Sequence, residues 1–265
     1  MNRFWVFLLL FRILLIVPTT ACAQNMLDMV DLKSDAFTKA EMSRADIEDA
    51  LRKLPSGQKL DLSGKSLNGL DLSNMDLRRV VLQSARLMNV KLKGANLEGV
   101  NLDSIWSLDS DFSNSKLKRA SLFGSQLIGS KLDGADLSKA RIAGDFSNAS
   151  MVGVNLENAD LSADEKNQSM GLMRGTFRST NLTRASLKGA NLKRAMLEFA
   201  TLRGANLKNV QLSGSELAGA DFTDADVTGA DFTDADLNSA RIAAMKNKSK
   251  AKNINKAKNL DKAYQ

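Results

Sequence analysis

The chain has 265 residues, a formal net charge of +7 and 43% hydrophobic residues, which is enough apolar surface for one or two ordinary domains. It contains no His and a single Cys, Cys22. These counts exclude most metal-binding, thiol and His-dependent catalytic chemistry, because that chemistry uses imidazole or thiolate side chains. We therefore expect no cofactor, no metal site and no small-molecule substrate.

Residues 1–23 have the pattern of a signal peptide. Arg3 precedes an apolar run that Arg12 interrupts, and Ala21-Cys22-Ala23 fits a small-x-small cleavage site. The apolar stretch is too short and too broken for a comfortable transmembrane helix. The sequence thus predicts export to the periplasm or the medium, with a mature chain that begins near Gln24.

A competing interpretation makes Cys22 the lipid-modified first residue of a membrane-anchored lipoprotein. Thr20-Ala21-Cys22 loosely resembles a bacterial lipobox, although the position three before the Cys, usually Leu, is Thr19. We predict contact with a membrane only if Cys22 carries a lipid.

The N-terminal segment, residues 24–59, is predicted to contain one short helix. Ser43 and Asp46 have the spacing of a helix N-cap, and an apolar stripe follows from Arg44 to about Leu54. If the next residues form a solenoid, its first coil exposes its core, and this helix would cover it.

A different period governs residues 60–242. A large apolar residue returns at every fifth position with a small residue two places before it, as in Ala185, Leu187, Ala190 and Leu192. A helix has a period of 3.6 residues and a strand a period of two, so neither would bury these leucines together. The chain must bend every five residues, and Gly or Asn often precedes the small residue, where a tight turn needs a positive φ.

The recurring pattern Ala-(Asp/Asn)-Leu-x-x resembles the pentapeptide-repeat family. Intact copies begin at Ala95, Ala135, Ala159, Ala190, Ala205 and Ala235. The resemblance implies an all-β solenoid, a right-handed quadrilateral β-helix with four pentapeptides in each coil. It would have about nine coils and an axis filled by side chains.

Three irregularities interrupt the repeat. Ser107 replaces a central apolar residue, which predicts a local bulge that turns Leu108 inward and packs Trp106 against it. One residue is missing between Ile142 and Phe146, and a polar stretch at 162–169 predicts a projecting loop. Such a loop is either a contact surface or a tolerated insertion.

The C-terminal tail, residues 243–265, is basic, with seven Lys and one Asp. Ile254, Ala257, Leu260 and Tyr264 fall near helical spacing. A C-terminal capping helix and a disordered basic tail are therefore the two alternatives.

The repeat itself is neutral overall, with 22 Lys or Arg and 22 Asp or Glu in residues 60–242. Near its end, aspartates follow one another without an intervening Lys or Arg, and they are the candidate interaction surface: Asp221, Asp224, Asp226, Asp231, Asp234 and Asp236. Either the lysines of the tail fold back on them, or they mediate contact with a partner or self-association through the solenoid end.

Together these features predict a non-catalytic module. The aspartates lie at the outward position that the family fills with Asp or Asn, so they are no evidence for acid–base catalysis. We predict an exported, rigid protein-interaction or structural module whose protein partner the sequence does not identify.

Two alternatives come from the family and from the charge. Some pentapeptide-repeat proteins resemble duplex DNA, bind DNA gyrase and protect it from quinolones, which requires an acidic surface and a cytoplasmic location. Direct nucleic-acid binding would use the lysines of the tail, but no aromatic stacking platform accompanies them, so the sequence argues against it.

Overall fold

The computed structural model describes residues 30–165 and 173–265. The chain divides into two compact units, residues 1–32 and 33–265, and the second contains the whole repeat. The predicted signal peptide 1–23 and Cys22 lie outside the described residues. No helix among those residues is long and apolar enough to cross a membrane.

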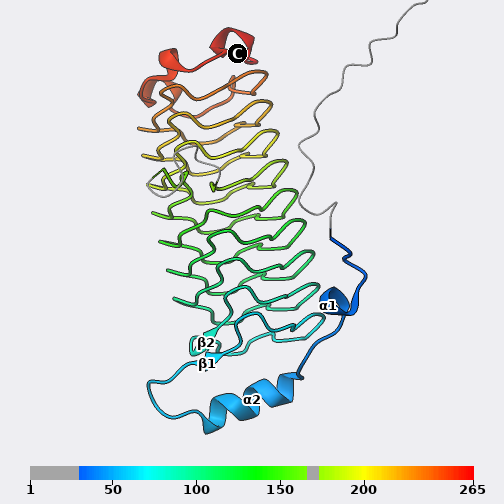
Figure 1. Ribbon diagram of the computed structural model, residues 1–265. Coiled ribbons are helices and arrows are strands. Elements are labelled where there is room, and N and C mark those ends of the chain that lie inside the picture. Colours follow the sequence, from blue (N-terminus) through cyan, green and yellow to red (C-terminus); the bar gives the residue numbers. More distant parts are fainter. Residues whose placement is uncertain (1–29, 166–172) are drawn as a thin grey trace, which may run out of the picture. The chain divides into compact units, whose positions relative to one another are not determined.

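Two helices precede the repeat, α1 (Asp35–Thr38) and α2 (Arg44–Lys53). The second lies where the sequence predicts a helix, and Ser43 and Asp46 form a reciprocal capping box at its start. Its Ile47 is buried, and the Arg44 guanidinium donates a hydrogen bond to the carbonyl oxygen of Asp71 at 3.1 Å. Helix α2 therefore covers the first coil (Figure 1).

The repeat forms stacked coils whose backbones pair in parallel. Strands β1 (Leu60–Asp61) and β2 (Val80–Val81) are paired, and single bridges continue the ladders, for example from Asp71 to Lys91 and from Lys91 to Asp111. Partners are 20 residues apart and successive bridges along the chain are five apart, so each regular coil has four sides of five residues (Figure 1).

The coils bury the residues that the period predicts. Ala185, Leu187, Ala190 and Leu192 are all fully buried, and they belong to one continuous hydrophobic cluster along the axis. Burial of each large side chain contributes about 1.5–3 kcal/mol. The ladders satisfy the backbone groups of the sides. The amide and carbonyl of each bridge residue bond to the coil before it, and the carbonyl of the preceding residue and the amide of the following residue bond to the coil after it.

Ser107 does not form the bulge that the sequence predicts. Trp106 bridges Arg86 and Gln126 in the regular register, and Ser107 points to the axis with no exposed surface. Leu108 is also buried, but on the outside of the coil rather than in the axis. The Trp106 ring packs on the Phe37 ring of α1, with ring centroids 5.5 Å apart. The prediction fails because Ser107 is small and its polar groups have partners, including the Ser130 hydroxyl, which donates to its carbonyl oxygen at 2.6 Å.

Before the C-terminal tail, two coils of the described chain depart from the 20-residue length. Gln126 pairs with Asp145, which is one residue short, and Asp145 pairs with Thr176, which adds eleven. The addition falls between the bridge residues Asp160 and Thr176, where the sequence predicts the 162–169 loop, and residues 166–172 lie outside the described residues. At its base the Ala163 amide donates to the carbonyl oxygen of Lys193 at 3.1 Å.

The structure of the C-terminal tail differs from both alternatives predicted from the sequence. Instead of one capping helix or a disordered segment, it continues the ladders through bridges at Lys246, Lys252, Lys258 and Tyr264. These bridges are six residues apart because each corner holds a short 3₁₀ turn: η2 (Lys248–Lys250), η3 (Ile254–Lys256) and η4 (Leu260–Lys262).

Candidate functional site

The aspartates predicted as an interaction surface separate into two groups. Four of them are bridge residues, one on each side of a single coil, and we call them the acidic belt: Asp221, Asp226, Asp231 and Asp236. All four are half-buried. Asp224 and Asp234 lie instead at corners, with φ values of 60° and 56°, and are exposed. The six carboxylates therefore form a ring around the coil rather than one acidic patch.

Aspartates of the acidic belt accept hydrogen bonds from residues of their own coil. The Thr223, Thr228 and Thr233 hydroxyls donate to the aspartate two residues earlier, at 2.5, 2.6 and 2.7 Å. The amide of each Thr donates to the same oxygen at 2.9 to 3.1 Å. This Asx-type arrangement closes the corner that follows each side.

The tail supplies the second set of donors through Asn rather than Lys. Side-chain amides of Asn247, Asn253 and Asn259 donate to Asp226, Asp231 and Asp236 at 3.1, 3.1 and 2.8 Å. These three Asn precede the 3₁₀ turns and have left-handed backbones. The sequence indicates this role only through a six-residue recurrence, Ala-Lys-Asn-x-x-Lys, at 251–256 and 257–262.

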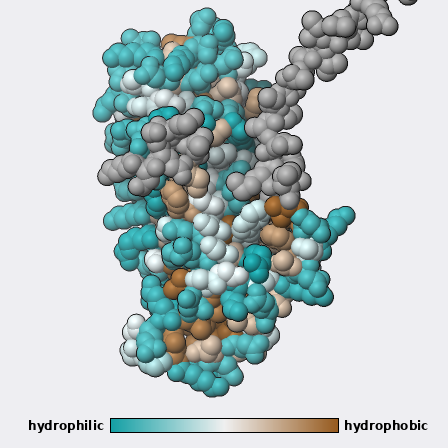
Figure 2. Space-filling view, in the orientation of Figure 1, coloured by the Kyte–Doolittle hydropathy of each residue, from teal (hydrophilic) through white to brown (hydrophobic). Residues whose placement is uncertain are grey.

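Asp221 differs from the other three belt aspartates because its carboxylate pairs with arginines. Its carboxylate lies 3.3 Å from the Arg203 guanidinium and 3.7 Å from that of Arg241. Of the tail lysines, Lys246 approaches an aspartate of this region, with its amine 3.9 Å from Asp224. The Lys side chains of the tail thus stay largely at the surface, and the C-terminal coils are mostly hydrophilic in Figure 2.

Hydrogen bonds favour the ionised form of three belt aspartates, Asp221, Asp226 and Asp231. Donation from the Thr228 hydroxyl is the main reason that the pKa of Asp226 lies far below its ordinary value. At Asp221 and Asp231 burial is the largest influence and opposes ionisation, but the hydrogen bonds and nearby positive charge, led by the Thr223 and Thr233 hydroxyls, together outweigh it and the pKa of each carboxyl is lowered. Asp221, Asp226 and Asp231 therefore hold a stable negative charge.

This lowering predicts a pH-dependent effect of Thr228→Val. Ionised Asp226 stabilises the fold fully above its unfolded pKa of about 4, and the contribution disappears as pH falls through the lower folded pKa. We expect the variant to lose about 1 kcal/mol of unfolding free energy at pH 7 and to approach the wild type below about pH 4. Urea titrations at both pH values measure the difference.

Thr183→Val is the matched control, because the Thr183 hydroxyl donates to the neutral amide oxygen of Asn181 at 2.6 Å. Its effect should not change over this pH range. Equal pH dependence in the two variants would contradict the assignment to Asp226.

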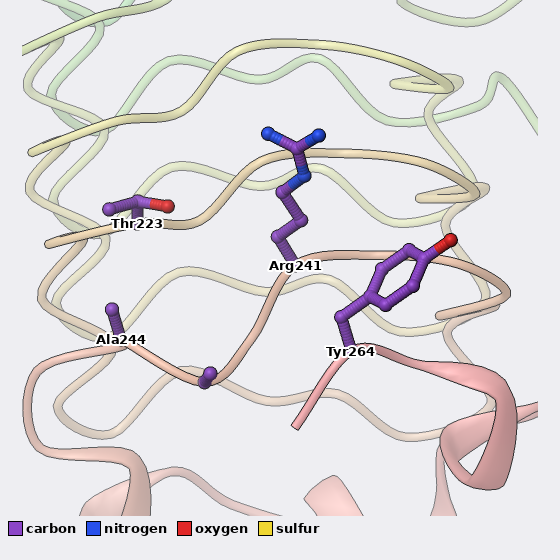
Figure 3. Close-up of a pocket in the computed structure, with 5 residues that line it drawn as sticks. Thr223, Arg241, Ala244 and Tyr264 are labelled. Atoms are coloured by element: carbon purple, nitrogen blue, oxygen red, sulfur yellow. The ribbon is translucent and has the colours of Figure 1, made fainter.

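A surface depression adjoins the belt. Thr223, Arg241, Ala243, Ala244 and Tyr264 line a space of about 510 Å³ (Figure 3). Its floor is apolar because two consecutive alanines form the corner, and the Tyr264 ring stands at one side. The sequence does not indicate this depression, because it depends on the six-residue spacing that places Tyr264 beside Arg241.

The described residues of this site offer carboxylates, guanidinium groups and hydroxyls for charge–charge contacts and hydrogen bonds. Within the described parts of the chain, no cluster of three or more His, Cys, Asp or Glu could hold a metal ion. The fold and the site therefore define a parallel β-solenoid with charged outer belts.

Comparison with known proteins identifies the class of solenoid. Residues 61–103, 109–142, 176–209 and 205–242 match the family described as pentapeptide repeats, in eight copies. The match covers more than half of the chain, and the chain belongs to this family. The prediction drawn from Ala-(Asp/Asn)-Leu-x-x is confirmed. No curated protein gives a significant sequence match.

Solved structures support the same fold. A trypsin-treated variant of QnrB1, a plasmid-mediated fluoroquinolone resistance protein, is 18% identical over 77% of this chain and 91% of its own, with a TM-score of 0.54. Full-length QnrB1 is 20% identical over 70% and 85%, with a TM-score of 0.50. HetL from the cyanobacterium Nostoc sp. strain PCC 7120 is 24% identical over 84% and 100%, with a TM-score of 0.40. The two QnrB1 structures imply a right-handed quadrilateral β-helix.

Proposed function

We propose that this protein is a non-catalytic, exported pentapeptide-repeat protein that acts as a rigid protein-interaction or structural module. The observation that carries the proposal is an axis filled by apolar side chains along the stacked coils. Central side chains such as Leu187 and Phe222 have no exposed surface, so contacts with other molecules must use the outer sides and corners.

Rigidity supports the same role. Each coil bonds to both neighbours through its backbone, and the side chains of the core interlock along the axis. A surface built this way loses little conformational entropy when it binds, because its groups are already ordered. The protein partner stays unidentified.

Export rests on the sequence of residues 1–23, with a lipid anchor at Cys22 as the alternative location. The gyrase-binding alternative requires retention in the cytoplasm. The fold it shares with QnrB1 supports testing that alternative. However, the belt carboxylates are half-buried and internally paired, unlike the open acidic surface that mimicry of DNA needs.

One experiment separates these possibilities. Cells that express the protein at its native level are cross-linked and fractionated, and the protein is recovered with its mass, N-terminus and cross-linked partners. We expect a chain that begins at Gln24 or at lipid-modified Cys22, outside the cytoplasm, cross-linked to another protein. An intact Met1 in the cytoplasm would refute export, and a cross-link to gyrase there would establish the alternative.

A further inference from the structure

The exposed large hydrophobic side chains of the described residues gather on one side of the solenoid. Phe199 is 68% exposed and Tyr264 is 63% exposed. Tyr264 continues a ladder through Arg241, Asp221 and Thr201, and we call the side that this ladder follows the Tyr264 face. Phe199 lies two residues before Thr201, at the corner where the chain enters this face.

Phe199 occupies a costly conformation. Its φ is 60°, in the left-handed region where the other non-glycine corner residues among those described are Asn, Asp, Ser, Arg or Lys. A bulky residue is disfavoured there because its Cβ crowds the following carbonyl oxygen. A Cβ added to Gly219, on the next coil, would lie 2.6 Å from the Phe199 ring, so this glycine leaves the space that the ring uses. Strain maintained together with apolar exposure indicates a functional contact.

In the last coil, the Tyr264 face differs from the other three sides of the solenoid. Its bridge residues are Lys246, Lys252 and Lys258 on three sides, and Tyr264 on the fourth. Exposed lysines hinder association between β surfaces, because their charge must be desolvated. Only the Tyr264 face lacks such a lysine in this coil.

The Tyr264 face also contains a complement to the Phe199 ring. The depression beside Tyr264, with its floor of Ala243 and Ala244, lies two coils further on, at the opposite edge of the face (Figure 3). Its volume of about 510 Å³ exceeds that of an aromatic side chain. A projecting ring and a receiving depression thus share one surface.

Such an arrangement is self-complementary under two-fold symmetry. When two copies face each other, a two-fold axis in the plane of contact, perpendicular to the line from ring to depression, exchanges the two features. The ring of each copy then meets the depression of the other, which closes the contact as a dimer. Charge permits this, because Arg203 and Arg241 both pair with the Asp221 carboxylate, which offsets part of their positive charge.

We propose that the Tyr264 face is a two-fold interface with a second copy of this chain, in which Phe199 of each copy enters the depression formed by Ala243, Ala244 and Tyr264 of the other. The interface lies on a side of the rod, not at the solenoid end suggested by the sequence, and it does not depend on the cellular compartment.

Sedimentation equilibrium of the purified full-length protein tests this interface. We expect a reversible dimer, with dissociation constants at least tenfold higher for Phe199→Gly and for Tyr264→Lys. Phe199→Gly should fold at least as stably as the wild type, because it removes the backbone strain. Asn209→Gly, at an exposed corner on another edge with φ of 56°, is the matched control and should not change dimerisation.

Cysteine cross-linking then tests the register. With Cys22 replaced by Ser, an equal mixture of the F199C and A244C single variants should form a disulfide-linked dimer under glutathione disulfide, whereas each variant alone should not. A wild type that stays monomeric at all concentrations would refute the proposal. So would cross-linking of F199C with itself alone, or a wild-type dimer whose dissociation constant is unchanged by Phe199→Gly.

Discussion

Phe177→Ala should reduce the free energy of unfolding by about 4 kcal/mol. Phe177 and Phe146 are central residues of adjacent coils, both without exposed surface, and their rings stack with centroids 5.2 Å apart and planes 14° apart. Truncation leaves a cavity that the backbone ladders on both sides prevent from collapsing, so the transfer and cavity costs add. Urea titration followed by far-UV circular dichroism measures the loss.

Phe123→Ala provides the comparison, because Phe123 points outward and is only half-buried beside the Arg141 guanidinium. Its loss should stay below about 1 kcal/mol. Similar losses in the two variants would show that the axis is not the main source of stability.

Gly144→Ala should cost about 3 kcal/mol, although the change adds one methyl group. Gly144 is at a corner of the coil that is one residue short, and its backbone there lies close to the neighbouring coil. A Cβ there would lie 2.5 Å from both the carbonyl oxygen and the hydroxyl of Ser125, and 3.1 Å from the carbonyl oxygen of Leu122. Because the backbone oxygens are fixed in ladders, the glycine segment itself must move. Thermal denaturation and urea titration both detect the change.

Gly153→Ala separates this steric effect from the effect of backbone conformation. Gly153 has a φ of 65° and open space around its Cα, so its substitution costs only the left-handed strain of about 1 kcal/mol. If Gly153→Ala proves as harmful as Gly144→Ala, the close packing at the short corner is not the cause.

The repeat could be predicted from the sequence because its signal is local and redundant. Leu187 and Leu192 each follow a small residue by two positions, and only a chain that bends every five residues buries all four. Ser107 could not be placed this way, since its inward position depends on hydrogen bonds to the coils around it. Judged by its polarity alone, a serine is expected outside the apolar axis.

The tail was missed because two periods coincide there. Ile254, Ala257 and Leu260 are three residues apart, which fits a helix, but the same residues fit a six-residue corner repeat. The structure selects the second because Asn253 and Asn259 take left-handed conformations and bind the acidic belt. A helix would forfeit these bonds and the ladder.

The arrangement of the aspartates in the candidate site follows from the number of residues in each coil. Residues five apart lie on different sides and residues 20 apart share a side, so Asp221, Asp226, Asp231 and Asp236 had to form a ring once the coil length was known. Phe199 was also readable, since it stands just before Ala200 in the corner position where Gly or Asn is usual. The depression was not, because it depends on side-chain size in three dimensions.

The eleven residues added at the loop corner show where this architecture admits change in chain length. On either side of them the ladders resume in register, with Asp160 bridged to Asn191 and Arg141 bridged to Asp160. An insertion at a corner is thus absorbed between two neighbouring sides and never reaches the coils beyond them. Corners can therefore diverge or receive a grafted peptide while the stack continues unaltered, whereas a change of length within a side would shift every later residue between axis and solvent.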